Sequence, residues 1–331
     1  MGTTVQRSKT VDLLKVLLCL GIVFRHAELV GVAGRSAVFA GFTRGMMLMT
    51  EACVPLFFAL SGYLYFLNGP DKPTASWFLK KTRSRVFTLL IPFLIANTVA
   101  FAFYWLANRF APDMVSGFFG EDWRNPLFIF WTGPMNLSLW FIRDLMYSVV
   151  LAPVIWLFVR YTRIWGVIAL GVLWFYGLLP VYVNFCFIAG AWAAVSRFDV
   201  ADTCRRAGPW LLLMYICSFV AVMADESLMT LSLLAALPVG IYLADALMRR
   251  CRWEIPQSWQ AWCFFMYLYH YMPEVGLKKA LIRFVDPSGF GSLLLVYLAD
   301  AVVTIGVVTL IYLVLKKLLP RVTGVLVGGK A

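Results

Sequence analysis

The sequence predicts an all-α integral membrane protein, a bundle of about ten transmembrane helices with both the N- and C-termini in the cytoplasm. Of its 331 residues, 62% are hydrophobic and 14% are charged, and the mean hydropathy is +0.80. A soluble domain has about 25% charged residues, so much of this surface must contact lipid. Because no Gly-, Ser- or Pro-rich linker divides the chain, we expect one transmembrane domain over residues 1–331.

Ten segments are long and apolar enough to cross a bilayer, which takes about 20 mainly apolar residues. They are approximately residues 11–31, 45–67, 86–107, 137–159, 164–179, 181–196, 209–224, 228–247, 258–277 and 292–315. Lipid offers no hydrogen-bond partners to open backbone groups, so each segment is expected to be helical. Lys15, Arg25 and His26 interrupt the first segment, which favours a retained span over a cleaved signal peptide.

The distribution of positive charge predicts the orientation of these spans. With a cytoplasmic N-terminus, nineteen of the 29 Lys and Arg residues fall on inner segments and three fall within spans. The seven on outer loops are Arg35, Arg44, Arg109, Arg124, Lys278, Lys279 and Arg283. This bias follows the positive-inside rule and explains the net charge of +12 without a nucleic-acid partner. The seven cysteines match no metal-ligand spacing, so neither a metal ion nor a disulfide framework is expected.

Two ionisable side chains of the first span form the first candidate site. Lys15 and His26 are eleven residues apart, so on a helix they lie about 20° apart around the axis and about 16–17 Å apart along it. That rise is comparable with an extended pantetheine arm, so Lys15 is suited to the phosphate end of a coenzyme A thioester and His26 to general base catalysis at its acyl end. Asp12, one turn before Lys15, is placed to orient it. The alternative is that both side chains only reach toward the membrane surfaces.

Further polar groups are predicted in the outer half of the membrane. Glu51 begins the second span from outside, Arg143 and Asp144 begin the fourth, and His270 and Glu274 share one face of the ninth at a spacing of four residues. As neighbours on a helix, Arg143 and Asp144 point about 100° apart and are expected to need different partners. Arg143 is a candidate for stabilising an oxyanion. Any of these groups can instead tie helices together as a buried pair.

An inner loop reads KKTRSR over residues 80–85. Four cations in six residues suit the phosphates of coenzyme A, so Arg83 and Arg85 are candidates for guiding the donor into the site. The alternative is that they are part of the positive-inside signal alone.

The motifs along the chain resemble the membrane-bound acyltransferase-3 family. Asp12-x-x-Lys15-x10-His26 is similar to its first-helix signature, and the likeness continues in order over nearly the whole chain. The matching stretches are VPLFFALSGYLYF (54–66), RVFTLLIPFL (85–94), LWFIRDLM (139–146), FIAGAWAA (187–194) and FFMYLYHYMP (264–273). Two departures stand out: Lys15 replaces the commoner arginine, which gives a point charge rather than a bidentate fork, and KKTRSR replaces a clean Arg-x-x-Arg.

This resemblance implies an O-acyltransferase of the plasma (inner) membrane, typically an acetyltransferase. Such a protein takes an acyl group from cytoplasmic acyl-CoA, here expected to be acetyl-CoA as co-substrate, and modifies a hydroxyl of a cell-surface or lipid-linked carbohydrate. Its catalytic pair carries over to Lys15 and His26. His26 then either activates the acceptor hydroxyl or briefly carries the acyl group itself.

Two other interpretations remain open on the sequence. A transporter or flippase for a lipid-linked saccharide or organic anion would also use ten spans and a polar cavity, although paired half-sequences typical of that class are not found. An inactive relative that serves as an assembly partner is the other, and the intact Lys15 and His26 pair argues against it.

Overall fold

The computed structural model describes residues 9–110, 128–178, 182–251, 255–256 and 258–329, and in these residues the chain forms helices and no strand. The all-α fold class is therefore confirmed. The chain forms two compact units. The first comprises the described parts of Met1–Leu20, Glu51–Pro73 and Ala152–Gln260, and the second those of Gly21–Thr50, Thr74–Leu151 and Ala261–Ala331. The expectation of one domain over residues 1–331 stays a prediction.

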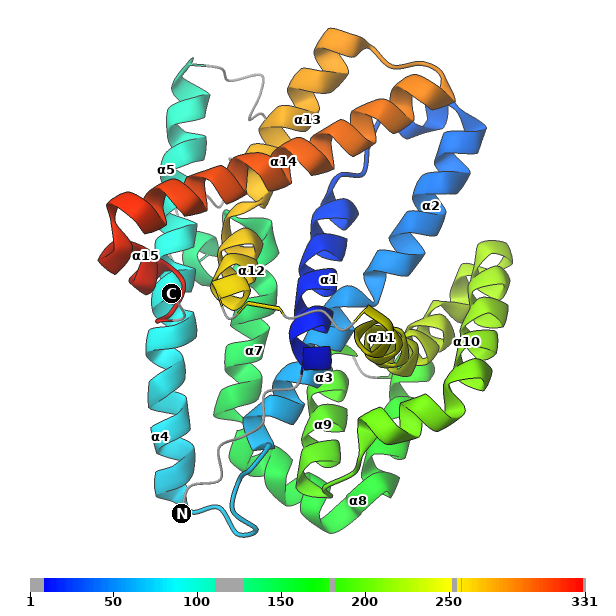
Figure 1. Ribbon diagram of the computed structural model, residues 1–331, viewed down its shortest axis with the longest axis vertical. Helices are drawn as coiled ribbons and strands as arrows, with labels where there is room; N and C mark the ends of the chain where they lie inside the picture. Colours follow the sequence, from blue (N-terminus) through cyan, green and yellow to red (C-terminus); the bar gives the residue numbers. More distant parts are fainter. Residues whose placement is uncertain (1–8, 111–127, 179–181, 252–254, 257, 330–331) are drawn as a thin grey trace. The chain divides into compact units, whose positions relative to one another are not determined.

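Fourteen α-helices of the described residues carry the labels used in Figure 1. They are α1 (Lys9–His26), α2 (Ala37–Glu51), α3 (Cys53–Phe66), α4 (Ala75–Arg85), α5 (Ile91–Phe110), α7 (Trp140–Val150), α8 (Ala152–Phe175), α9 (Tyr182–Val195), α10 (Val200–Ala224), α11 (Met229–Cys251), α12 (Ser258–Tyr269), α13 (Tyr271–Val285), α14 (Phe290–Leu318) and α15 (Pro320–Leu326). Short 3-10 or π segments are η1 (Ala33–Arg35), η2 (Val86–Leu90), η4 (Phe128–Thr132), η5 (Leu137–Leu139) and η6 (Glu226–Leu228).

Six helical segments of the described residues are long and apolar enough to cross a membrane, so the chain is a multi-pass membrane protein. They are Ala37–Phe66, Ala75–Phe110, Ala152–Phe175, Val200–Ala224, Glu226–Cys251 and Phe290–Leu318. α1 is 18 residues long but carries Lys9, Asp12, Lys15 and Arg25. The count of ten spans and the cytoplasmic location of both termini stay predictions.

Prolines explain why several predicted spans are interrupted. A proline inside a helix has no N–H for the carbonyl four residues earlier and also clashes with it. Pro55 removes the partner of the Glu51 carbonyl, and α2 ends at Glu51. In the same way Pro273 removes the partner of the Tyr269 carbonyl, and α12 ends at Tyr269. Two of the predicted spans, 45–67 and 258–277, are therefore each built from two helices.

The predicted boundary between the fourth and fifth spans lies inside α8. The helix runs from Ala152 to Phe175, but at Arg163 the backbone has φ 54° and ψ −141°. These angles are not helical, so α8 consists of two helical segments that meet at Arg163. The sequence placed the same boundary at residues 160–163.

The first unit depends on close helix contacts at small residues. α3 and α9 run side by side in Figure 1 and make extensive contacts. A Cβ atom on Gly62 would overlap the backbone of Phe187, and a Cβ atom on Gly190 would overlap the backbone of Ala59. Each helix thus presents a glycine to the main chain of the other, the close packing by which small residues hold membrane helices together.

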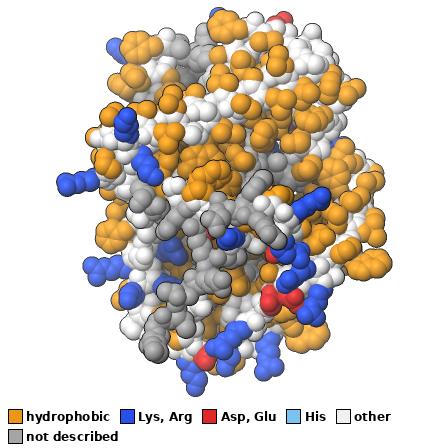
Figure 2. Space-filling view, in the orientation of Figure 1, with side chains coloured by type: hydrophobic (Ala, Val, Ile, Leu, Met, Phe, Trp, Pro, Cys, Tyr) orange, Lys and Arg blue, Asp and Glu red, His pale blue; other side chains and the backbone are white. Residues whose placement is uncertain are grey.

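In the second unit, α13 and α14 lie side by side (Figure 1), and α15 packs against α5. Exposed positions of α14 are apolar, for example Val302 at 60% and Leu310 at 62%, and hydrophobic side chains cover much of the face shown in Figure 2. The buried face of α14 contains Asp300 and Thr304, both fully buried. A helix with an apolar outer face and buried polar groups indicates an internal polar site.

Candidate active site

His26 is the last residue of α1 and lies beside two rings from the start of α13. The centroid of its imidazole is 5.4 Å from that of His270 and 5.2 Å from that of Tyr271, with the Tyr271 ring nearly perpendicular. The two histidines of the chain, predicted in the first and ninth spans, therefore meet in the second unit. This pairing is the centre of the candidate active site.

The orientation of His270 is set by the end of α12. Its Nδ1 atom lies 3.0 Å from the carbonyl oxygen of Met266 and 3.0 Å from that of Tyr267. Because carbonyl oxygens only accept hydrogen bonds, Nδ1 must carry the proton. In a neutral imidazole Nε2 then has a free lone pair, and this atom has no hydrogen-bond partner among the described residues. His270 thus presents a proton acceptor in a fully buried position.

Asn136, which lies just before η5, binds the end of α12 through its side chain. Its Nδ2 donates to the Leu268 carbonyl over 2.7 Å, and its Oδ1 accepts from Ser138 Oγ over 2.7 Å. Its backbone N–H donates to Oδ1 of Asn97 over 3.3 Å, and the Tyr267 hydroxyl donates to the Ser138 carbonyl. Asn97 and Asn136 are both fully buried. The network binds the Leu268 carbonyl and the Tyr267 hydroxyl and so holds the last turn of α12, which precedes His270.

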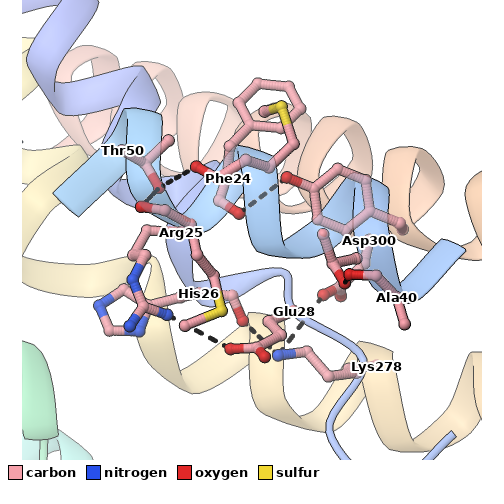
Figure 3. Close-up of polar contacts among 12 residues, drawn as sticks. Phe24, Arg25, His26, Glu28, Ala40, Thr50, Lys278 and Asp300 are labelled. Carbon is pink, nitrogen blue, oxygen red and sulfur yellow. Dashed lines mark hydrogen bonds and ion pairs between the residues drawn. The ribbon is translucent and has the colours of Figure 1, made fainter. Parts of the chain in front are cut away.

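The C-terminal end of α1 is anchored by side chains of α13 and α14. The last carbonyl groups of a helix have no partners within it. The Tyr297 hydroxyl of α14 donates to the Phe24 carbonyl over 3.0 Å, and Lys278 Nζ of α13 donates to the His26 carbonyl. Figure 3 shows Lys278 beside the backbone of His26. His26 is thus held through its main chain as well as flanked through its ring.

Three ionisable groups lie together near His26, namely Glu274 and Lys278 of α13 and Asp300 of α14, here called the lysine–carboxylate cluster. Lys278 Nζ is 4.0 Å from Asp300 Oδ2, and Glu274 interacts electrostatically with both other residues. Glu274 and Asp300 are fully buried. None of their four carboxylate oxygens has a hydrogen-bond partner within the part of the chain that the structure describes.

Arg143 and Asp144 pair with one another rather than with different partners, which corrects the expectation from the helical spacing. Arg143 Nε donates to Asp144 Oδ1 over 2.8 Å, because the long arginine side chain can fold back onto its neighbour. Arg143 Nη1 also donates to the carbonyls of Thr132 and Trp131 over 2.6 and 3.3 Å. The pair therefore holds the end of η4.

The remaining candidates are divided between the units. Asp12, Lys15 and Glu51 belong to the first unit, and Arg83 and Arg85, in the last turn of α4, belong to the second. Asp12 is buried, Lys15, Glu51 and Arg85 are half-buried, and Arg83 is exposed. Their roles stay predictions.

Sequence reasoning missed three residues of the site: Tyr271, Lys278 and Asp300. Asp300 carried a clear signal, because it is a carboxylate within the long apolar run of residues 292–315. Lys278 is four residues after Glu274 and hence on the same helix face. The predicted spans place Lys278 in an outer loop, but α13 continues to Val285 and the Lys278 side chain is only 17% exposed.

Comparisons with known proteins show the family of this chain. The chain is 30% identical over 227 residues to the succinoglycan biosynthesis protein ExoH of Rhizobium meliloti. The match covers 61% of this chain and 58% of that protein, so the chain spans less than two thirds of the relative's length. No solved structure matches the chain. The family model described as an acyltransferase domain matches residues 9–313, nearly the whole chain. The chain belongs to the acyltransferase-3 family.

Proposed function

We propose that this protein is a transmembrane O-acyltransferase of the plasma membrane. It moves an acetyl group from cytoplasmic acetyl-CoA to a hydroxyl of a cell-surface or lipid-linked carbohydrate. Membership of the acyltransferase-3 family supports acyl transfer, and the relative named for succinoglycan biosynthesis supports a glycan as acceptor. The observation that carries the proposal is the position of His26 beside the fixed imidazole of His270.

His26 is the proposed general base. It takes the proton of the acceptor hydroxyl while the hydroxyl oxygen attacks the thioester carbonyl. The carbon–sulfur bond then breaks, the acetyl group stays on the acceptor oxygen, and the coenzyme A thiolate leaves with the proton from His26. The lone pair of His270 Nε2 faces a buried environment in which only a nearby donor can satisfy it, and an imidazolium at His26 is such a donor. The arrangement follows the logic of a base oriented by a second group.

The donor is proposed to use the cations carried over from the family pattern. Lys15 binds the phosphate end of acetyl-CoA and Asp12 orients Lys15. Arg83 and Arg85 guide the donor from the cytoplasm. Arg143 stays a candidate for stabilising an oxyanion, because Asp144 and the two carbonyls accept only from Nε and Nη1 of its five-donor guanidinium. Glu51 and Glu274 stay candidates for binding the acceptor.

The test combines a binding and a transfer measurement. Acetyl-CoA binding to the detergent-purified protein is measured by calorimetry, and transfer is measured with radiolabelled acetyl-CoA in membranes of host cells that lack the native gene. The variants are His26→Ala, Lys15→Ala and, as a matched control for lost charge, Arg109→Ala at the far end of α5. We expect His26→Ala to bind the donor and transfer nothing, and Lys15→Ala to bind it weakly. Full transfer by His26→Ala would contradict the assignment.

One observation favours transport as a second candidate function. The helix pair α12–α13 is broken at the buried His270, and transporters bind substrates at discontinuous helices of this kind. Uptake or flipping of a lipid-linked saccharide by reconstituted protein without acetyl-CoA would support it. The absence of donor binding in the calorimetry experiment would put it first.

A further inference from the structure

The lysine–carboxylate cluster lies next to the proposed base, and two of its members, Lys278 and Asp300, have no role in the proposed reaction. Lys278 pairs with one of two fully buried carboxylates, that of Asp300, and no described residue donates a hydrogen bond to either carboxylate. Burying charged groups in a membrane protein costs free energy, and breaking a buried pair by removing one partner costs more. A cluster kept at this cost indicates a role beyond packing.

The geometry of Lys278 connects the cluster to His26. In Figure 3 the Lys278 ammonium lies between the backbone of His26 and the carboxylate of Asp300. It donates to the His26 carbonyl and lies 4.0 Å from Asp300 Oδ2. A positive charge at the C-terminal end of a helix interacts favourably with the helix dipole. Lys278 therefore stabilises the end of α1 by this electrostatic interaction as well as by its hydrogen bond.

Holding the carbonyl of His26 also restrains its side chain. The direction of the Cα–Cβ bond depends on the backbone of the same residue, and His26 is the point where α1 stops restraining that backbone. A displacement of about 1 Å at a catalytic group can lower a rate about 100-fold. The ring of His26 must keep its place against His270 and Tyr271, so the main-chain anchor bears directly on the reaction.

We propose that Lys278 is a positioning residue for His26 in acyl transfer, and that Asp300 holds Lys278 in place for this purpose. The inference rests on the proposed function of His26 as the base. In this role Lys278 contacts the main chain of His26, the proposed base, and contacts no reacting atom. Its loss lowers the maximal rate and leaves the binding of the donor unchanged.

A purely structural role makes a different prediction that can be separated from this one. If Lys278 only neutralises Asp300, then removing both charges together restores stability and activity in parallel. If Lys278 positions His26, removing both restores stability but leaves the rate low. The variants are therefore Lys278→Met, Asp300→Asn and the double variant. Lys279→Met is the control, because its side chain leaves α13 about 100° away.

The experiment measures melting temperature in detergent, acetyl-CoA affinity by calorimetry, and the rate of radiolabelled acetyl transfer in host membranes over a range of acetyl-CoA concentrations. We expect Lys278→Met to lower the melting temperature and to lower the maximal rate about 10- to 100-fold, with KM for acetyl-CoA unchanged. In the double variant the melting temperature returns toward wild type and the rate stays low. Lys279→Met keeps the wild-type rate.

Three outcomes would overturn the inference. They are a wild-type maximal rate in Lys278→Met, recovery of the rate together with the melting temperature in the double variant, or, if no Lys278 variant can be purified, a wild-type maximal rate in Asp300→Asn. If only this inference fails, the wild-type protein still transfers acetyl groups and His26→Ala does not. If the proposed function itself fails, the wild-type protein transfers no acetyl groups.

Discussion

The imidazole rings of His26 and His270 lie 5.4 Å apart, centroid to centroid, one at the end of α1 and the other at the break between α12 and α13. Both residues stand where a helix ends, and side-chain hydrogen bonds add to those of the backbone, such as the bond from the His270 N–H to the Met266 carbonyl. Lys278 donates to the carbonyl of His26, and His270 donates to two carbonyls of its own preceding turn. The geometry proposed for catalysis therefore depends on these anchors.

The role of His270 Nε2 can be tested with a near-isosteric substitution. In His270→Asn the amide nitrogen takes the place of Nδ1 and keeps a donor for the carbonyls of Met266 and Tyr267, but no lone pair replaces Nε2. We expect a folded protein whose maximal transfer rate falls about 10- to 100-fold, since general acid–base partners contribute about 100-fold or more. His270→Ala removes both functions and should also lower the melting temperature. An unchanged rate in His270→Asn would show that Nε2 takes no part.

The buried Asn136 is predicted to be important for stability. Replacing it with alanine leaves the Leu268 carbonyl and the Ser138 hydroxyl without their partners, and each unsatisfied buried group costs about 1–3 kcal/mol. We expect a clear fall in the melting temperature of the detergent-solubilised protein. Asn108→Ala, at an exposed position of α5, is the matched control and should melt like wild type. Equal melting temperatures for the two variants would contradict the importance of the network.

Close packing of α3 and α9 predicts that Gly62→Ala and Gly190→Ala destabilise the first unit. Each added methyl group meets backbone atoms of the opposite helix, which cannot rotate away. Overpacking of this kind costs about 1–3 kcal/mol or more, so the yield of folded protein and its melting temperature should both fall. Gly306→Ala on α14 is the control, because nothing lies within 4 Å of its added Cβ. Wild-type stability in both α3 and α9 variants would show that these helices can separate freely.

Helical periodicity predicts relations within one helix, and this limits how much of the site could be predicted from the sequence. The spacing of His270 and Glu274 is a property of one helix, and so is that of Lys15 and His26. The meeting of His26 with His270 is not, because periodicity shows which face is polar but not which distant helix covers it. The breaks at Glu51 and Tyr269 could have been predicted from Pro55 and Pro273. The pairing of Arg143 with Asp144 could not, because it depends on side-chain rotamers.

The cations at the end of α4 give a prediction that depends on salt. Arg83 and Arg85 lie in the last turn of α4, with Arg83 exposed and Arg85 half-buried. Contacts between exposed cations and phosphates are weakened by screening. We expect the double variant Arg83→Gln/Arg85→Gln to bind acetyl-CoA about 5- to 30-fold more weakly than wild type, as two surface charge contacts would allow. The maximal transfer rate at saturating donor should change little, since these residues touch no reacting atom.

Salt separates a direct phosphate contact from a general loss of positive charge. If Arg83 and Arg85 bind the donor, wild-type affinity falls as salt rises from low to physiological concentration, and the double variant shows a shallower fall. Arg109→Gln is the control, because Arg109 lies at the other end of the continuous α4–η2–α5 segment, about 35 Å away at 1.5 Å per residue. It should bind acetyl-CoA with wild-type affinity and wild-type salt dependence. Equal weakening by the Arg109 variant would mean that the field of the whole protein attracts the donor, and the role of these two residues in guiding it would be wrong.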